Sequence, residues 1–179
     1  MAFWTDATGK DPKRKYRFKV ELNGGAASGT DLEQVIWFAK TVDKPEITVN
    51  TGEVNYLSHK FYYPGTVEWN EVSLVLVDPV SPDAASATLD MLTAMGYLGP
   101  NQLNSAQPLT QTKTKAFQVE ITQIDAEGVP QEKWTLNNAI ITKAGFGDLD
   151  YSSEDLSEIS LSFRYDWATC VAAGETYFK

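Results

Sequence analysis

Two reactive side-chain types are almost missing from this chain of 179 residues, which has one cysteine, Cys170, and one histidine, His59. A single cysteine excludes an internal disulfide and fits folding in a reducing compartment such as the cytoplasm. We expect Cys170 to be buried and unreactive. Any mechanism based on an imidazole would have to use His59, which lies in an alternating stretch and is predicted to be packed or partly exposed.

Long hydrophobic runs are also lacking, and so are the short motifs of catalysis. No stretch of 18 apolar residues is present, so no membrane-spanning helix is predicted. The first residues contain no hydrophobic signal core, so we expect no Sec-type export. Neither a nucleophile elbow, a P-loop, an HExxH motif, a CxxC pair nor a dinucleotide fingerprint occurs.

One acidic stretch contains four carboxylates, which we list here: Asp148, Asp150, Glu154 and Asp155. Two paired carboxylates could serve glycoside hydrolysis, and four could hold calcium. The spacing does not match the calcium loop, and Tyr151 and Leu156 interrupt the cluster. We interpret it as a solvated turn and predict no catalytic residue, no cofactor and no metal.

Positive charge is in short supply, because 15 lysines and arginines face 24 carboxylates and the net charge is −9. Non-specific nucleic-acid binding requires basic side chains that displace counterions from phosphates. We therefore exclude a protein that binds DNA tightly through its phosphates. An acidic chain can still surround DNA and let a polyanion slide, or its charge can simply keep the protein soluble.

The composition indicates one globular domain over residues 1–179, since 42% of the residues are hydrophobic and 22% are charged. Residues 1–15 are polar and basic at their end, and we interpret them as an N-terminal arm. Loops are predicted at 23–31 and at 98–114, where glycine, proline and polar residues gather. The second loop is longer than most connections in compact domains, so we expect it to be either mobile or in contact with a partner.

Alternating apolar and polar residues predict most of the chain to be β-strand. The candidate strands are 16–22, 35–39, 117–122, 133–136 and 159–167. The last is the longest, with Ile159, Leu161, Phe163, Tyr165 and Trp167 expected on one face. One amphipathic helix is predicted at 82–95, with Ser81 as N-cap and Gly96 after its end. Its buried stripe is expected to contain Ala85, Leu89, Leu92 and Met95.

A long hairpin is predicted between residues 40 and 78. We expect Gly52 to form its turn and Pro64-Gly65 to break its second strand. Residues 69–77 should then be a strand buried on both faces. The register predicted for the second strand separates two faces, one with His59, Phe61 and Tyr63 and the other with Lys60 and Tyr62. An arm this long is hard to bury within one small domain, so we interpret it as reaching a neighbouring subunit.

These elements predict a mainly β, antiparallel sandwich or half-open barrel of seven or eight strands with one flanking helix. The apolar strands carry little proline or lysine to protect their edges. Joining of neighbouring copies edge to edge in a ring would remove the edges and close one barrel across the subunits. Stacking of such rings would give an open-ended polymer.

Two regions of the chain resemble the tail tube proteins of contractile-tailed, myovirus-like bacteriophages, which are related to tube proteins of type VI secretion and of contractile injection particles. The first region contains Lys40, Pro45, Lys60, Pro64-Gly65, Trp69, Val72-Ser73-Leu74 and Asp78. The second, 139–167, contains an apolar turn with glycine, then Leu149-Asp150-Tyr151 and Tyr165-Asp166-Trp167. Together they span about half the chain, in the family's order. The loops at 23–31 and 98–114 and the tail after Trp167 depart from the pattern.

The resemblance implies a structural protein, not an enzyme, whose hexameric rings stack into the inner tail tube, a conduit for DNA within a contractile sheath. Its implied partners are other copies of itself, sheath, baseplate, tail-terminator and tape-measure proteins, and DNA in the lumen. The implied location is the virion, after assembly in the host cytoplasm. The absence of a fused effector favours a phage over the alternative, the tube of a bacterial injection or type VI-like system.

The hairpin at 46–66 is the implied contact between rings, and its candidate residues are Ile47, Val49, Asn55, Tyr56, Lys60 and Tyr62. Polar strand faces are candidates for the lumen lining: Gln118, Glu120, Thr122, Ser160, Ser162 and Arg164. Two rivals stay open. One is a β-sandwich that binds sugar or lipid through Trp37, Trp69 and Trp134, and the other is a hydrolase that uses the acidic stretch.

Overall fold

The computed structural model describes residues 13–23, 39–81, 83–97, 116–152 and 154–178. Several sequence predictions therefore lie wholly or largely outside the described residues. These are the N-terminal arm up to residue 12, the loops at 23–31 and 98–114, the strand at 35–39 except Ala39, and the side chains of Trp37 and Pro82.

The described residues form ten strands and one helix, which confirms a mainly β, antiparallel fold with one helix. The elements are β1 (Phe18–Asn23), β2 (Ala39–Val42), β3 (Ile47–Tyr56), β4 (His59–Trp69), β5 (Val72–Val77), α2 (Ala84–Ala94), β6 (Phe117–Ile124), β7 (Pro130–Gly145), β8 (Glu158–Arg164), β9 (Trp167–Ala172) and β10 (Glu175–Tyr177).

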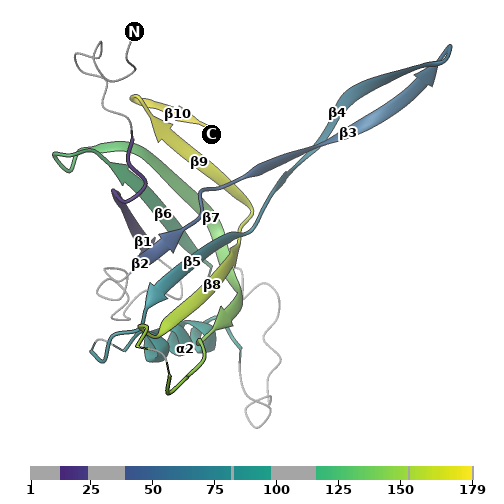
Figure 1. Ribbon diagram of the computed structural model, residues 1–179. Coiled ribbons are helices and arrows are strands. Elements are labelled where there is room, and N and C mark those ends of the chain that lie inside the picture. The colour runs from purple at the N-terminus through teal and green to yellow at the C-terminus, as the bar shows by residue number, and fades with distance from the viewer. Residues whose placement is uncertain (1–12, 24–38, 82, 98–115, 153, 179) are drawn as a thin grey trace.

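Strand β7 organises the body because it joins the two halves of one curved sheet. Its first half pairs with β6 on one side and with β9 on the other, and its second half pairs with β8. The path β1-β6-β7-β8-β5-β2 is a strongly curved sheet, and the β9–β10 hairpin branches from it (Figure 1). Residues 139–145 of the region that resembles the tail tube family continue β7, and the predicted turn with glycine before Leu149 follows them, where Gly147 has a φ of 70°.

The change of partner along β7 coincides with a bend at Asn138, which has a φ of 55°. Asparagine tolerates this left-handed conformation better than most residues. The Asn138 side-chain amide donates to the Asp166 carboxylate at 2.9 Å, and the Asp166 N–H donates to the Asn137 carbonyl at 3.1 Å. The paired chain bends at the same level, between β8 and β9. The predicted single strand at 159–167 is therefore two strands, and Trp167 is exposed rather than inward.

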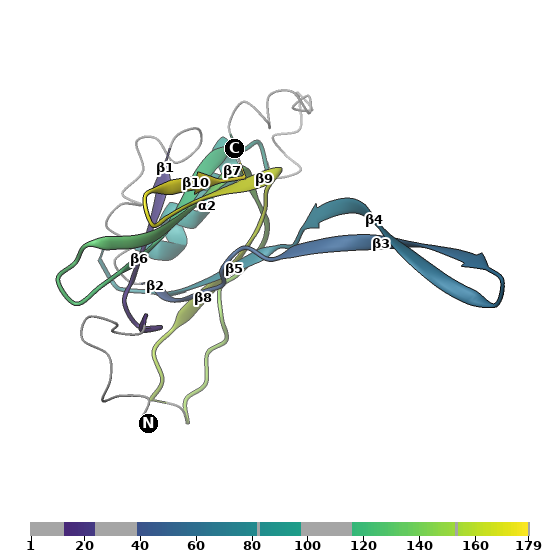
Figure 2. The same cartoon turned by 90° about the horizontal axis from the view of Figure 1, so that it is seen from above.

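The core lies inside the curve of the sheet. Alternate residues of β5, β6 and β8 are buried, and the rings of Phe117 and Phe163 meet edge to face with centroids 5.7 Å apart. Helix α2 lies across one end of the curved sheet (Figures 1 and 2). Strand β5 alternates between buried and less buried residues, so the prediction of a strand at 69–77 buried on both faces was wrong.

The helix is confirmed, but its predicted start was wrong, and its predicted buried stripe was wrong at Leu89. Asp83 rather than Ser81 is the N-cap, and its carboxylate accepts from the Ser86 N–H at 3.1 Å. The buried side chains are Ala84, Ala87, Thr88, Met91 and Met95, while Leu89 is 52% exposed. Ala85 and Leu92 of the predicted stripe are partly buried and pack against the core, so Leu89 is the member of the predicted set that does not. Gly96 follows the helix with a φ of 97°, as expected.

The predicted hairpin is present but longer than expected. Its turn is at Leu57 and Ser58, both with positive φ, while Gly52 lies inside β3. Pro64 and Gly65 do not end the second strand. They lie within β4, where the pairing register shifts by one residue between Val49 and Thr51. Proline is tolerated there because each strand of a two-stranded hairpin has one free edge.

The bend at Asn138 provides a test of the fold. Replacement by valine would force a β-branched residue into a positive φ and remove the bond to Asp166, so we expect a loss of about 2–3 kcal/mol in the free energy of unfolding. Asn138→Gly loses the hydrogen bond but tolerates the φ, and should cost about 1 kcal/mol. Denaturant unfolding of both variants measures the difference, and equal losses would contradict a role for the backbone conformation.

Candidate assembly surfaces

The β3–β4 hairpin, hereafter the arm, projects from the body as an isolated two-stranded ribbon (Figures 1 and 2). It pairs with no other strand among the described residues. Eight of its large apolar side chains are between 48% and 75% exposed: Val49, Val54, Tyr56, Leu57, Phe61, Tyr62, Tyr63 and Val67. Isolated hairpins are marginally stable in water, and an apolar surface of this extent marks an interaction site.

The register divides the outer arm into two faces, because residues opposite each other in a ladder share a face. We define the aromatic face as Gly52, Val54, Tyr56, His59, Phe61 and Tyr63. The other, mixed face contains Thr51, Glu53, Asn55, Lys60, Tyr62 and Pro64, and Lys60 forms an ion pair with Glu53 at 2.8 Å. The faces predicted for His59, Phe61 and Tyr63 and for Lys60 and Tyr62 agree with this register.

Gly52 has a packing role that its predicted place in a turn did not suggest. A Cβ atom at this position would lie 2.2 Å from the ring of Tyr63, which crosses from β4 over the glycine. The absence of a side chain therefore lets the Tyr63 ring lie flat against the backbone of β3. This contact helps to order the aromatic face on a ribbon that has no second layer.

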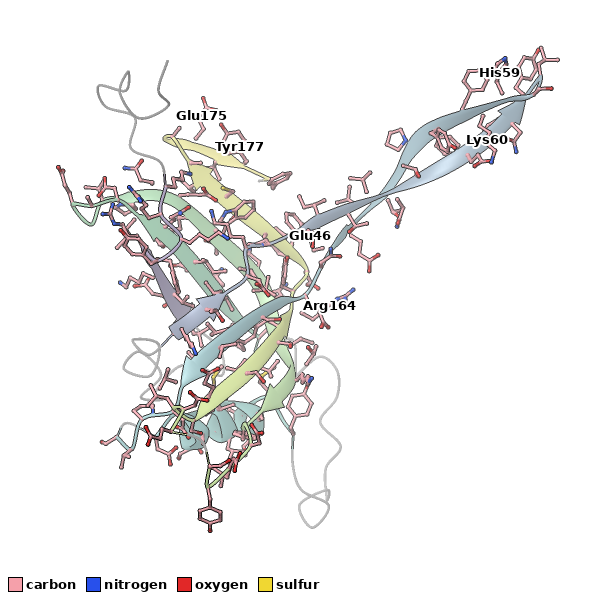
Figure 3. The ribbon with its side chains drawn as sticks, in the orientation of Figure 1. Glu46, His59, Lys60, Arg164, Glu175 and Tyr177 are labelled. Atoms are coloured by element: carbon pink, nitrogen blue, oxygen red, sulfur yellow. The ribbon has the colours of Figure 1, made fainter. Side chains whose placement is uncertain are left out.

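The root of the arm is anchored to the body by aromatic and charged contacts. The ring of Trp69 lies 5.9 Å from that of Tyr165 and 5.6 Å from that of Phe178, centroid to centroid. Burial raises the pKa of Tyr165 to about 12, so the phenol stays neutral. Arg164 pairs with Glu68 at 3.2 Å and lies beside the root (Figure 3). These contacts fix the direction in which the arm leaves the body.

The six predicted contact residues of the hairpin all lie on this arm. Ile47 and Val49 lie in the half nearer the body, and the register places them with Asn55, Lys60 and Tyr62 on the mixed side. Tyr56 is on the aromatic face. Sequence reasoning missed Phe61, Tyr63 and Leu57 as exposed residues. The alternation of aromatic residues in 59–63 was visible, but the absence of any layer that covers them was not.

The six predicted lumen residues lie on two strands, β6 and β8, that are not neighbours in the curved sheet. Gln118, Glu120 and Thr122 belong to β6, where Gln118 donates to Asn137 and Glu120 pairs with Lys133 at 2.8 Å. Thr122 is only 8% exposed. The other three, Ser160, Ser162 and Arg164, belong to β8, which β7 separates from β6 in the strand order.

Strand edges are available at the ends of the curved sheet. Within the described residues, β1 pairs only with β6, β2 pairs only with β5, and β10 pairs only with β9. A cavity of about 760 Å³ adjoins β1 and β2, and its lining includes Phe18, Val42, Ile121 and Trp134. Unpaired edges of this kind are sites for pairing with another chain.

One partly buried carboxylate ties the segments at this end together. Glu132 of β7 accepts hydrogen bonds from Lys13, from Lys44 at 2.8 Å and from the Trp134 indole N–H. Burial by itself would raise the pKa of Glu132, but these three donors outweigh burial and lower the pKa to about 2. Lys44 lies in the link to the arm, so Glu132 fixes the start of the arm as well.

The features that could have supported catalysis are dispersed. His59 is exposed at the tip of the arm, far from the acidic stretch (Figure 3). Cys170 is buried, as expected, and burial together with the charge of Glu132 raises the pKa of its thiol. Hydrogen bonds from the Ser152 N–H and hydroxyl lower the pKa of Asp150. Within the described residues no three metal-ligating side chains gather.

Two further observations bear on the alternative interpretations. Trp69 and Trp134 are half-buried in packing and hydrogen-bonding roles, so they do not form an exposed aromatic platform for a sugar. Among the described residues, no helix has the length and apolar character needed to cross a membrane.

Comparison with known proteins places the fold. A scan of protein-family models and a search of curated proteins gave no match. Solved structures do match. A chain of the anti-feeding prophage baseplate is 14% identical over 93% of this chain and 99% of that chain, with a TM-score of 0.63. A chain of the extended sheath–tube complex of PVC, an extracellular contractile injection system, is 16% identical over 92% and 95%, with a TM-score of 0.65.

The crystal structure of an Hcp protein is 18% identical over 90% of this chain and 95% of that chain, with a TM-score of 0.50. At these identities the matches show a common fold. The chain therefore shares its mainly β, antiparallel fold with this Hcp protein and with chains found in contractile injection assemblies. The fold class predicted from the sequence is confirmed.

The Glu132 cluster leads to a prediction about acid stability. The pKa of Glu132 in the folded protein, about 2, is below its ordinary value of 4.5, so its ion pairs stabilise the fold above pH 4.5 and this stabilisation is lost as the pH falls towards 2. The full shift corresponds to about 3 kcal/mol, and solvent around the half-exposed lysines reduces this to about 1–2 kcal/mol.

We therefore expect Glu132→Gln to lower the free energy of unfolding at pH 7 by about 1–2 kcal/mol, with a difference from the wild type that shrinks between pH 5 and pH 2. Urea unfolding over this pH range measures it. Glu127→Gln, in the turn between β6 and β7, is the matched control and should leave stability unchanged at every pH. A constant difference for Glu132→Gln across the range would contradict the role of its charge.

Proposed function

We propose that this chain is a structural subunit, not an enzyme, of the hollow inner tube of a contractile, tail-like particle. Copies form hexameric rings, and the rings stack inside a sheath. The observation that carries the proposal is the arm, which exposes eight large apolar side chains on a chain with the fold of a sheath–tube complex component. Such an arm needs a second subunit to cover it.

Lateral association closes the ring. The unpaired edges of β1, β2 and β10 give each subunit strands that can pair with those of its neighbours. Ring-wide pairing satisfies the backbone donors and acceptors that the single chain leaves open, and a closed barrel has no edges. The sequence predicted seven or eight strands per subunit, which is too few, because the chain from Trp167 onward adds β9 and β10.

The outer face of β1, β6 and β7 is the better candidate for the lumen lining. Gln118 and Glu120 lie there with Lys19, Glu21 and Lys133, and the pairs Lys19–Glu21 and Lys133–Glu120 balance charge within the face. A polar surface with paired charges lets a polyanion or a folded cargo pass without sticking. Arg164 is engaged with Glu68 at the arm root, so the β8 face is the weaker candidate.

Contacts with other tail components follow from the same assembly. Chains of this fold occur in structures of a baseplate, a sheath–tube complex, a sheath/tube terminator and a tube-terminating cap. We propose sheath, baseplate, terminator and tape-measure proteins as partners of this chain, with no sequence-specific contact to DNA. The proposed location is a tail-like particle assembled in the cytoplasm.

The cargo separates two versions of the proposal. In a phage tail the tube delivers DNA, and in an injection or type VI-like system it delivers proteins. The net charge of −9 is compatible with DNA passage, while the solved structures with TM-scores of 0.63 and 0.65 come from injection assemblies. Affinity purification of particles through a tagged chain distinguishes them, because DNase-protected DNA in the particles supports the phage tail and its absence supports an injection system.

Negative-stain microscopy tests the tube itself. The purified chain at high concentration should give rings with six-fold end views, or hollow filaments of stacked rings. A strictly monomeric protein in sedimentation at the same concentration would contradict the proposal and favour a binding module.

The arm can be shortened without disturbance of its root. Replacement of residues 50–66 by Asn-Gly keeps the Val49–Val67 pair and the Trp69 contacts, and provides a two-residue hairpin turn. We expect rings to form but stacking into filaments to fall by at least about tenfold, a loss of about 1.4 kcal/mol per contact or more. Val54→Thr/Phe61→Thr keeps the full arm and tests its apolar surface alone. Filaments of normal length from the shortened chain would show that the arm is not the contact between rings.

A further inference from the structure

The surface that receives the arm can be located on the same chain. We infer that the end loop, defined here as residues 146–152 and 154–157 between β7 and β8, binds the aromatic face of the arm of a second copy in the adjacent ring. This inference rests on the stacking proposed above. It adds the receiving side of the contact, which neither the fold nor the arm identifies.

Exposed apolar side chains distinguish the end loop from an ordinary solvated turn. Leu149 is 95% exposed, Leu156 is 71% exposed, and Tyr151 is fully exposed. Val80, in the nearby turn before α2, is also fully exposed. Single exposed apolar residues are common, but several large ones in one loop indicate a surface that another molecule covers. The interpretation of the acidic stretch as a solvated turn therefore explains its carboxylates but not its exposed apolar side chains.

The end loop also borders a groove of about 800 Å³. Leu149 and Leu156 line it together with Gly147 and Ser157, and carboxylates surround them. The charged lining residues are Asp148, Asp150, Glu154, Asp155, Glu158 and Lys40. Lys40 pairs with Glu158, so the groove keeps an excess of negative charge. An apolar surface that carries no carboxylate would fit both the apolar lining and the charge of the groove.

The aromatic face of the outer arm meets this requirement. Between Val54 and Val67 the sequence contains no carboxylate. The aromatic face presents Tyr56, Phe61 and Tyr63 with His59, while Lys60 and its ion-pair partner Glu53 lie on the mixed face. The aromatic face therefore brings no negative charge into the acidic groove, whereas a face with carboxylates would be repelled.

The positions of the two surfaces give the contact its direction. The arm leaves one side of the body, while the end loop lies at the opposite end, beside α2 (Figure 1). Two different surfaces at opposite ends of one molecule form a heterologous contact, which repeats without closing and builds an open-ended stack. A contact between identical surfaces would stop at two rings.

Disulfide cross-linking tests the contact directly, because Cys170 is only 6% exposed and gives little background. Phe61→Cys/Leu149→Cys places one thiol on the aromatic face and one in the end loop. Oxidised filaments of this variant should give a ladder of covalent multimers on a non-reducing gel, with each single variant giving at most dimers. The matched control, Phe61→Cys/Val129→Cys, moves the second thiol to the exposed turn between β6 and β7 and should give no ladder.

The outcomes separate this inference from the proposed function. Filaments that form but yield no ladder from Phe61→Cys/Leu149→Cys would overturn the receiving surface and leave the tube proposal standing. A control pair with an equal ladder would overturn it as well. Failure of the wild-type chain to form any ring or filament would instead overturn the proposed function.

A second variant keeps the test independent of cysteine chemistry. Leu149→Ser/Leu156→Ser removes two exposed apolar side chains from the groove without disturbance of the core, so the variant should fold like the wild type by circular dichroism. We expect rings with at least a tenfold higher protein concentration needed for stacking. Unchanged stacking of this variant would contradict the inference, and Val129→Ser is the matched surface control.

Discussion

A two-stranded ribbon cannot cover its own side chains, and this constraint governs the molecule. In the body, each apolar strand face has the opposite wall of the curved sheet or α2 to pack against. The arm has only two faces and no second layer, so its valines and aromatic residues remain half exposed. Burial of large apolar side chains is the main favourable term in association, and the arm retains this free energy until another subunit is present.

The body is built so that the arm is held firmly while its own edges remain open. β7 joins the two halves of the curved sheet by a bend at Asn138, and the same bend in the paired chain places Tyr165 beneath Trp69 at the arm root. Glu132 fixes Lys44 in the link that precedes β3. The free strands adjoin these anchors, since β2 ends just before Lys44 and β10 just before Phe178. The unpaired strand edges and the exposed faces of the outer arm are nevertheless formed by different residues, so lateral and axial association use different surfaces.

Much of this architecture could be predicted from the sequence, because periodicity reports burial directly. The strands around Val20, Val119 and Leu161 alternate cleanly, and Gly96 follows the end of the helix as expected. The failures came where long-range pairing overrides local signals. The Pro64-Gly65 pair is typical of a strand end, yet it lies within β4, because each strand of a two-stranded hairpin has one free edge where proline is tolerated. Residues 139–145 continue β7 because they pair with β8.

The candidate surfaces were predictable in part for a similar reason. The aromatic residues of 59–63 and the apolar residues of the acidic stretch are visible in the sequence, but exposure depends on the absence of neighbours. No local sequence pattern indicates that the Tyr151 side chain is fully exposed, or that the Tyr63 ring lies across Gly52. The same limit applies to the residues predicted to line the lumen. Periodicity identifies a polar face on β6 and another on β8, but it cannot indicate which of the two faces the lumen.

The anchored root of the arm makes it a lever. Ten residues of β3 at about 3.3 Å each give a length of about 33 Å, so a rotation of about 5° at Trp69 would move the tip by about 3 Å. The pitch and twist of a filament would then be set where the arm begins, by the packing of Trp69 against Tyr165 and Phe178. Sequence changes in the last residues of the chain could alter the geometry of a whole filament without any change in the surfaces that touch.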